Sequence, residues 1–178
     1  MQYGFEKQLE VGKKANREIV KYLKSLSHTL AVIDVEEDKM FQEKDIDLIY
    51  IFLKNKKIMV ETIEIKGDMQ EKTGNFFMET VSNKEKKTKG CFLYSEADYF
   101  FYYFINTNEL NVIPLKKARK YVIAHFSEFK MREVQTKVGG SFYESQGLLV
   151  PKGQLSKLGV YPRNLTQFRE EKQTKMKV

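Results

Sequence analysis

The sequence predicts an α/β (α+β) fold in which a central β-sheet is flanked by helices. Residues 8–26 carry apolar side chains at close to a 3.6-residue period, which is typical of an amphipathic helix. Several strand candidates then follow one another, and two of them, residues 46–53 and 58–66, are rich in apolar side chains. A basic segment that begins at residue 116 and extends to about residue 129 predicts a second helix. This order of a helix, consecutive strands and a helix indicates a sheet with helices packed against it.

Shorter elements complete the predicted order. Further strands are expected at residues 30–35, 75–82, 91–94 and 99–105, separated by charged or polar loops. After residue 129 the sequence predicts a loop through Gly139 and Gly140, a short strand at 148–151 and a short helix near 154–158. The chain shows no internal repeat and no low-complexity linker. We therefore expect one domain, residues 1–168, followed by a charged tail, residues 169–178.

One predicted strand is almost entirely aromatic, from Tyr99 to Phe104. A continuous aromatic run is typical of a strand that is buried on both faces. A platform on which nucleic-acid bases stack is the alternative interpretation.

The composition excludes several classes of protein. With 42% hydrophobic and 13% aromatic residues among 178, the chain has enough apolar material for a packed core and is not a disordered chain. No stretch approaches the ~20 apolar residues that cross a bilayer, and the N-terminus has no signal-peptide pattern. The single cysteine, Cys91, excludes an intrachain disulfide and is expected to be a buried structural thiol. These features predict a cytoplasmic protein with no membrane partner.

The chain is basic, with 31 Lys and Arg residues against 24 Asp and Glu residues and a net charge of +7. Most of the basic residues are lysines, which act as point charges, whereas arginine reads base edges in a bidentate manner. A nucleic-acid partner would therefore be held mainly through its phosphate backbone. The basic residues predicted to make this contact are Lys116, Lys117, Arg119 and Lys120 in the second helix, and Lys86 and Lys87 in a charged turn. A merely solvated surface is the alternative.

Two short motifs bring carboxylates to the predicted strand pair. The Asp-Ile-Asp motif at residues 45–47 opens the first strand, and the Glu-Ile-Lys motif at residues 64–66 ends the next. Alternate residues of a strand share a face, so Glu64 and Lys66 point together. In an antiparallel pair, the start of one strand lies beside the end of the next. We therefore expect Asp47 and Glu64 to be neighbours, with Lys66 close by.

Carboxylates that converge beside an apolar sheet are costly unless a cation binds them. Mg²⁺ or Mn²⁺ suits such hard oxygen ligands, with substrate phosphate and water completing the shell. Lys66 could orient or help to deprotonate a water, or offset charge that develops on a phosphoryl group. Together these groups suffice for phosphodiester hydrolysis. A ladder of salt bridges on the surface is the alternative.

The arrangement resembles the PD-(D/E)XK nuclease superfamily, whose members include Holliday junction resolvases and many phage nucleases. The resemblance covers roughly residues 8–105 and implies a restriction-endonuclease-like core with a central mixed β-sheet. It implies that Asp47 and Glu64 are metal ligands and that Lys66 is the catalytic lysine. Asp45 is a further carboxylate that could assist as a metal ligand.

The resemblance also points to additional acidic residues. Small phage-type members can carry an acidic residue on the strand after the Glu-x-Lys motif, and Glu79 matches that position. Many members place a glutamate in the first helix, whereas the best-matching position here is Asn16. Glu18 and Glu10 are the nearby acidic candidates, but Glu18 lies about 200° around the helix from Asn16. The helix ligand is therefore Glu18, Glu10 or absent.

The sequence thus predicts a metal-dependent DNA endonuclease, directed by the structure or the backbone of its substrate, with Mg²⁺ or Mn²⁺ as cofactor. The alternatives are a catalytically inactive nucleic-acid-binding module of the same fold and a protein-interaction subunit. Junction resolution would require a homodimer, because two symmetric cuts need two active sites. The resemblance implies a phage or mobile-element source and a location in the cytoplasm of a bacterium or a phage-infected host cell.

Overall fold

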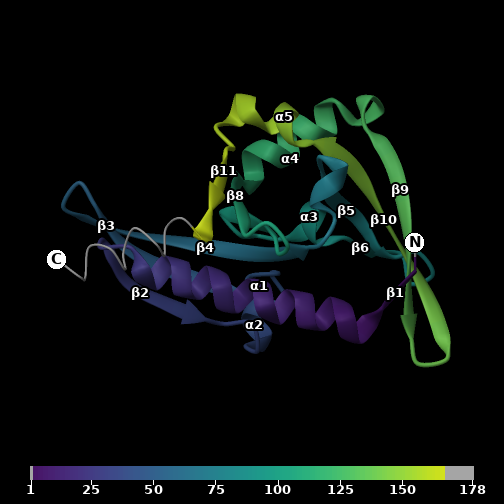
Figure 1. The fold of residues 1–178 in the computed structure, drawn as a ribbon, viewed down its shortest axis with the longest axis horizontal. Helices are drawn as coiled ribbons and strands as arrows, with labels where there is room; N and C mark the ends of the chain where they lie inside the picture. The colour runs from purple at the N-terminus through teal and green to yellow at the C-terminus, as the bar shows by residue number, and fades with distance from the viewer. Residues whose placement is uncertain (1, 167–178) are drawn as a thin grey trace.

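The structure, a computed structural model, describes residues 2–166 and contains two β-sheets with helices around them (Figure 1). The predicted tail at residues 169–178 lies outside the described residues. No helix of the described part is long and apolar enough to cross a membrane.

The larger sheet has six strands and confirms the predicted mixed α/β architecture. Its strands are β2 (Thr29–Asp34), β3 (Leu48–Lys54), β4 (Lys57–Asp68), β7 (Tyr99–Phe104), β8 (Glu109–Pro114) and β11 (Pro162–Asn164), in the order β11-β8-β7-β4-β3-β2. Strands β4 and β7 run parallel, whereas the other neighbours run antiparallel. The long strand β4 therefore lies near the middle of a mixed sheet, paired with a strand on each side.

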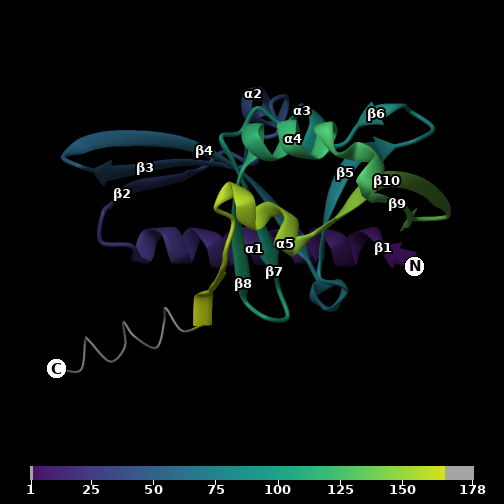
Figure 2. The same cartoon turned by 90° about the horizontal axis from the view of Figure 1, so that it is seen from above.

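Helix α1 (Phe5–Ser25) covers one face of this sheet, as the apolar period of the sequence predicts (Figures 1 and 2). Ala15, Ile19 and Leu23 on the helix are buried in one cluster with Leu48 of β3 and Ile63 of β4. Burying such side chains contributes ~1.5–3 kcal/mol each, which fixes α1 on the sheet.

The smaller sheet has five strands and packs on the opposite face of the larger one. Its strands are β1 (Gln2–Gly4), β9 (Lys130–Val138), β10 (Ser141–Pro151), β5 (Asn75–Asn83) and β6 (Thr88–Lys89), in the order β1-β9-β10-β5-β6. Phe76 and Met78 of β5 and Leu148 of β10 pack against Phe100 and Phe104 of β7. The molecule thus has α1 on one side of the central sheet and the second sheet on the other.

Short helices fill the remaining space on the side of the second sheet. They are α2 (Lys39–Gln42), α3 (Cys91–Tyr94), α4 (Leu115–Ala124) and α5 (Lys152–Leu155), with the 3₁₀ turns η1 (Glu71–Thr73), η2 (Phe126–Glu128) and η3 (Ser156–Leu158). Leu115, Ala118 and Val122 of α4 are buried in the same cluster as Phe92 of α3. Helices α3 and α4 therefore cover part of the face that does not contact α1.

The aromatic strand β7 is buried on both faces, which confirms the core interpretation of residues 99–104. Phe100, Tyr102 and Phe104 face the second sheet, while Phe101 and Tyr103 face α1. These rings therefore form the interior of the fold and are not a base-stacking surface.

Three sequence expectations are wrong. Residues 91–94, expected as a strand, form helix α3. Gly90 precedes this helix and packs so close to Glu79 that a Cβ there would lie 2.4 Å from the Glu79 carbonyl oxygen. Residues 130–151, expected as a loop and one short strand, form the long β9–β10 hairpin. The predicted second helix also ends at Ala124, before a 3₁₀ turn.

Candidate functional site

The β3–β4 pair brings Asp47 and Glu64 together, as their positions in the sequence predict. Asp47 immediately precedes β3, and its backbone nitrogen donates to the carbonyl of Ile63 at 2.9 Å. Its carboxylate Oδ2 accepts a 2.7 Å hydrogen bond from the backbone nitrogen of Ile65. The carboxyl groups of Asp47 and Glu64 also lie close enough for each to affect the pKa of the other. Two buried carboxyl groups this close are disfavoured in the doubly ionised form, so a proton or a cation stabilises the pair.

Asp45 reaches the same place from the turn before β3. Its backbone has a φ of 54°, in the left-handed region that an aspartate tolerates better than most residues. The hydroxyl of Tyr94 donates to Asp45 Oδ1 at 2.9 Å, and the hydroxyl of Ser95 donates to the Asp45 carbonyl at 2.8 Å. These contacts fasten the turn to the end of α3 and orient the Asp45 carboxylate.

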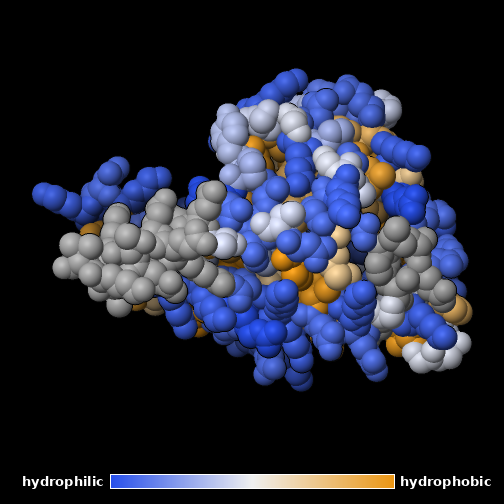
Figure 3. Space-filling view, in the orientation of Figure 1, coloured by the Kyte–Doolittle hydropathy of each residue, from blue (hydrophilic) through white to orange (hydrophobic). Residues whose placement is uncertain are grey.

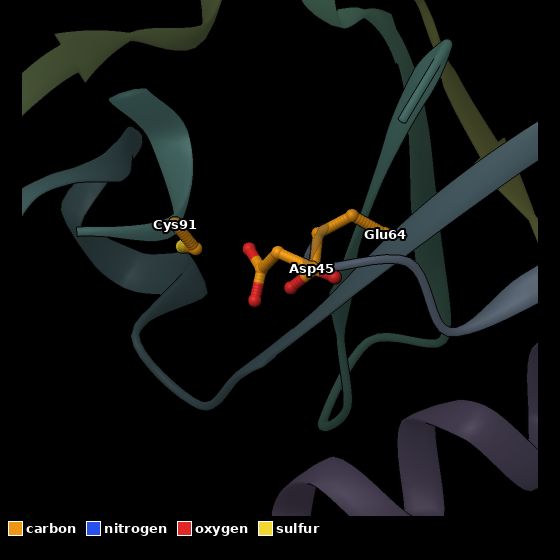
Figure 4. A group of neighbouring side chains, drawn as sticks. All are labelled: Asp45, Glu64 and Cys91. Atoms are coloured by element: carbon orange, nitrogen blue, oxygen red, sulfur yellow. The ribbon is translucent and has the colours of Figure 1, made fainter. Parts of the chain in front are cut away.

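Cys91, the first residue of α3, completes a cluster of three potential metal ligands (Figure 4). One ligand atom from each of Asp45, Glu64 and Cys91 lies within 4.8 Å of the other two. Figure 4 shows the Asp45 carboxylate between the Cys91 sulfur and the Glu64 side chain. The sequence reasoning missed Cys91 as a site residue, because it placed residues 91–94 in an apolar strand.

Two oxygens of this cluster are buried and have no hydrogen-bond partner: Oδ2 of Asp45 and Oε2 of Glu64. The Glu64 residue is only 7% exposed. A buried, unpaired carboxylate oxygen is costly, and a cation is the partner that would satisfy both oxygens at once. The donor set of hard oxygens therefore fits a divalent metal ion such as Mg²⁺ or Mn²⁺.

The electrostatics of the cluster agree with this fit. Burial, followed by the nearby carboxylates of Asp47 and Asp45, raises the pKa of Glu64 well above its usual value. Burial also raises the pKa of Asp47 to about 7 and that of Asp45 above its usual value. Without a cation, the cluster therefore holds protons near neutral pH, and a bound ion would displace them.

Lys66 lies on the same face of β4 as Glu64 and is half-buried. Burial disfavours its charged form, but the negative groups around it, Glu79 foremost and then Cys91, Asp68 and Glu64, outweigh burial and raise its pKa. Lys66 is therefore an ammonium ion that supplies positive charge beside the cluster. This environment favours charge stabilisation over removal of a proton from water.

Glu79 and Asp68 surround this lysine. Glu79 lies on β5 in the second sheet, so its charge reaches Lys66 from across the space between the sheets. Asp68 accepts a short hydrogen bond from the hydroxyl of Tyr102, which in turn accepts a 3.0 Å bond from the backbone nitrogen of Phe77. This chain of bonds joins the two sheets beside the site.

A cavity of about 540 Å³ opens beside the cluster. Its walls come from both sheets and from the N-terminal half of α1, and its residues include Gly12, Glu64, Lys66, Glu79, Cys91, Arg132 and Tyr143. Figure 3 shows that hydrophobic side chains gather in the middle of this face, above α1, on an otherwise mostly hydrophilic surface. The volume lies within the range of ~300–1,000 Å³ that is typical of ligand sites.

The first helix contributes a polar link to the site instead of an acidic side chain. Asn16, buried in α1, donates to Glu36 Oε2 at 2.8 Å and to Asp34 Oδ2 at 3.2 Å. Glu36 contributes, after burial, to the raised pKa of Asp47, so it lies close to the cluster. The sequence reasoning missed Glu36, which lies in a charged loop with no periodic pattern.

The two acidic candidates on α1 lie elsewhere. Glu10 is exposed, Glu18 forms a 3.3 Å ion pair with Lys21, and neither lines the cavity. The structure therefore does not bring Glu10 or Glu18 to the cluster of Asp45, Asp47 and Glu64.

The predicted nucleic-acid contacts fall into two groups. Lys116, Lys117 and Lys120 are exposed on α4, and Lys86 and Lys87 are exposed in the turn between β5 and β6. Arg119 differs, because its guanidinium donates to the carbonyls of Phe92 at 2.8 Å and Ser95 at 2.7 Å. Arg119 thus fastens α4 to the segment that carries Cys91, and the lysines are the cations that face solvent.

Comparison with known proteins gives one structural likeness. No protein-family model matches the chain, and no curated protein matches it. The chain is similar to the solved structure of D212, a nuclease from a fusselovirus, over 91% of this chain and 88% of that chain. The sequence identity is 17% and the TM-score is 0.43. The functional conclusion therefore depends on the geometry of the acidic cluster.

Proposed function

We propose that the protein is a metal-dependent nuclease that hydrolyses phosphodiester bonds in DNA. The observation that carries this proposal is the convergence of Asp45 and Glu64, both with buried unpartnered oxygens, beside the half-buried ammonium of Lys66. Asp47 lies near enough to raise the pKa of Glu64. Their order along the chain and on the strands is the one expected for the PD-(D/E)XK superfamily.

The three carboxylates would hold Mg²⁺ or Mn²⁺ through their oxygens. When bound, such an ion polarises a phosphoryl oxygen and lowers the pKa of a coordinated water. Asp47 is held for this task by its bond from the Ile65 backbone, and Asp45 by its bond from Tyr94. Because both side chains are fixed in advance, little reorganisation is needed when the ion and the substrate arrive.

Lys66 performs the second task. Its ammonium would donate to the phosphoryl oxygens as negative charge develops on them, and Glu79 and Asp68 keep it protonated. Low exposure strengthens each of these interactions, because water screens them less. Lys66 is thus proposed to stabilise charge while the carboxylates hold the ion.

The substrate would enter through the cavity between the sheets. Arg132 and Tyr143 of the β9–β10 hairpin line the same cavity as Glu64, so they would contact the strand next to the cleaved bond. The exposed lysines of α4 and of the β5–β6 turn would attract the phosphate backbone beyond the cavity. Contacts of lysines with the phosphate backbone favour cleavage directed by the structure of the DNA, such as single strands, flaps or junctions. We place this activity in the cytoplasm of a bacterium or phage-infected cell.

The test is cleavage of a DNA panel by the purified full chain. The panel holds duplex, single strand, flap and four-way junction, each with Mg²⁺, Mn²⁺ or EDTA, and Glu64→Gln is the inactive control. We expect cutting that requires the ion and is lost in Glu64→Gln. Exposed Glu43→Gln is the matched control, because it removes the same charge outside the cluster.

A catalytically inactive DNA-binding module is the second candidate. The observation in its favour is Asn16, which stands where many nucleases of this type carry a glutamate and which binds Glu36 instead. DNA binding by the wild-type chain, without cleavage of any substrate under any ion, would replace the nuclease proposal with this one.

A further inference from the structure

The thiol of Cys91, a soft ligand, lies beside the hard carboxylate ligands of the proposed hydrolytic site. Its sulfur lies within 4.8 Å of a carboxylate oxygen of Asp45 and of Glu64 (Figure 4). Mg²⁺ is a hard ion that is coordinated by oxygen ligands and not by sulfur. Zn²⁺ and Cd²⁺ accept thiolate and carboxylate together, so the thiol changes which ions the cluster can bind.

The position of Cys91 is fixed by the fold from two sides. On one side, Gly90 packs against the backbone of Glu79, where any side chain would collide with the Glu79 carbonyl. On the other side, Arg119 donates to the carbonyls of Phe92 and Ser95, and Ser95 itself bonds to the backbone of Asp45. The sulfur and the Asp45 carboxylate are therefore held on one rigid unit, facing the Glu64 carboxylate.

We propose that Asp45, Glu64 and Cys91 form a mixed thiolate–carboxylate site for a thiophilic divalent ion, Zn²⁺ or Cd²⁺, and that this ion blocks the hydrolytic reaction. The site is supported by the unpartnered oxygens Oδ2 of Asp45 and Oε2 of Glu64, the latter on a side chain that is almost completely buried. The blocking effect rests on the proposed nuclease function, whereas the binding of the ion does not.

The geometry suits a tetrahedral ion. Ligand atoms at 2.0–2.3 Å from a tetrahedral Zn²⁺ are about 3.3–3.8 Å from one another, so small side-chain rotations would close the present spacing. On binding, the S–H bond breaks, the proton leaves to solvent and a sulfur–metal bond forms, without any change of oxidation state. Three protein ligands leave a fourth position open for water or substrate.

The two kinds of ion compete because they use the same oxygens. An ion drawn toward Cys91 would take Asp45 and Glu64 and leave Asp47 outside its coordination shell. Glu64 would then no longer be available with Asp47 for the ion that the hydrolytic reaction needs. The thiophilic ion is therefore an inhibitor of the site and not a substitute cofactor.

The binding test is a titration of the full chain with CdCl₂, followed by ultraviolet absorption of the thiolate-to-metal charge transfer. Cys91 is the only cysteine in the chain, so the signal reports on this sulfur alone. We expect a band that saturates at one Cd²⁺ per chain and is absent in Cys91→Ser. We also expect Asp45→Asn to weaken binding at least tenfold, whereas Glu43→Gln, an exposed acid two residues away, leaves the affinity within twofold.

Either of two results would overturn the site: no charge-transfer band in the wild-type chain, or a band whose affinity is the same in Asp45→Asn, which would mean that the sulfur binds alone. Circular dichroism of each variant shows that the fold is retained.

Inhibition is tested separately, as the Zn²⁺ concentration that halves the Mg²⁺-dependent cleavage rate of each variant. We expect this concentration to rise at least tenfold in Cys91→Ser, and an unchanged value would refute the inhibitory role. A chain that binds Cd²⁺ at Cys91 but cuts no DNA would refute the nuclease proposal and leave the ion site standing.

Discussion

The two faces of strand β4 have opposite properties, although their residues alternate along one short segment. Ile63 and Ile65 face α1 and pack in an apolar cluster, with Ile63 fully buried. Glu64 and Lys66 face the second sheet, where a carboxylate is buried without a full set of partners. One face therefore stabilises the fold, and the other concentrates charge at a cost in stability.

A strand can thus carry a reactive site on one face while the other face and the backbone hold it in the sheet. The backbone of β4 is paired with β3 on one side and β7 on the other, and α1 packs against its apolar face. These stabilising contacts offset the cost of burying the charged groups of Glu64 and Lys66 on the polar face. Functional sites commonly contain such destabilising features, which the surrounding structure compensates.

The largest expected effect is the loss of activity on the polar face. Glu64→Gln removes one carboxylate charge and keeps the shape of the side chain, so cleavage should fall about 10³-fold or more. The same change replaces a carboxyl group whose ionised form is disfavoured by burial, so the free energy of unfolding should stay the same or rise. Cleavage rates and urea unfolding of the two proteins measure both effects. Full cleavage activity in Glu64→Gln would show that the polar face of β4 has no chemical role in the reaction.

The apolar face should show the reverse pattern. Ile63→Ala creates a cavity under α1 and should lower the free energy of unfolding by about 2–5 kcal/mol. Cleavage per folded molecule should change little at low temperature. Ile58 lies on the same strand but is 67% exposed, so Ile58→Ala should change stability by less than about 0.5 kcal/mol. Equal losses at the two positions would show that α1 does not anchor β4.

The pH dependence of stability should distinguish the faces as well. Burial raises the pKa of Asp47 from 3.8 to about 7, so the folded state binds more protons than the unfolded state between these values. The contribution of Asp47 to stability therefore falls as pH rises through this window. Asp47→Asn should gain stability relative to wild type from pH 4 to pH 7 by a few kcal/mol, at most about 4.

Urea unfolding of both proteins over this range, without divalent ions, measures that difference. Glu43→Gln controls for the change in net charge and should show no comparable trend. Added Mg²⁺ should raise the stability of the wild type at pH 7 and above more than that of Asp47→Asn, because the ion binds only the folded state. A difference that shrinks as pH rises would contradict the raised pKa of Asp47.

The residues that follow local rules could be predicted from the sequence. The period of residues 8–26 predicted helix α1. The alternation of β4 and its antiparallel pairing with β3 placed Asp47, Glu64 and Lys66 correctly relative to one another, because strand geometry determines which side chains are neighbours. The burial of the aromatic strand β7 also followed from its composition. These features need no knowledge of distant contacts.

Other parts depend on contacts between distant segments and could not be predicted. Cys91 reaches the cluster because Gly90 packs on Glu79 and Arg119 holds the end of α3, and neither contact has a signal in the local sequence. Strand β9 was missed because, of its residues, only Thr136 is buried, which leaves no apolar alternation to detect. Its partner β10 and the parallel pairing with β1 determine its conformation instead.

The β9–β10 hairpin extends the comparison of faces to a second strand. Tyr143 lines the cavity, whereas its neighbour Phe142 is 47% exposed and lies outside it. If the cavity holds a DNA strand, Tyr143→Ala should weaken single-strand binding about tenfold, since stacking on one base is worth ~1–3 kcal/mol. Fluorescence anisotropy in the Glu64→Gln background measures this. Phe142→Ala should stay within twofold of the parent, and an equal loss in both variants would mean that DNA does not use the cavity.

The smallest expected effect concerns the lysines of α4, which packs on the same face of the central sheet as Glu64. Changing Lys116 and Lys120 to Gln should weaken DNA binding a fewfold for every sequence, because these lysines contact phosphates and not bases. It should also make the slope of log affinity against log salt shallower by about 1–2. The matched control changes Lys54 and Lys57 to Gln, since both are exposed at the β3–β4 turn, at the opposite end of β4 from Glu64. If the substitutions at both lysine pairs reduce the slope equally, the attraction comes from the net charge of the whole molecule, and α4 has no special part in binding. A reduction confined to the α4 pair would place the path of the DNA over the polar face of β4.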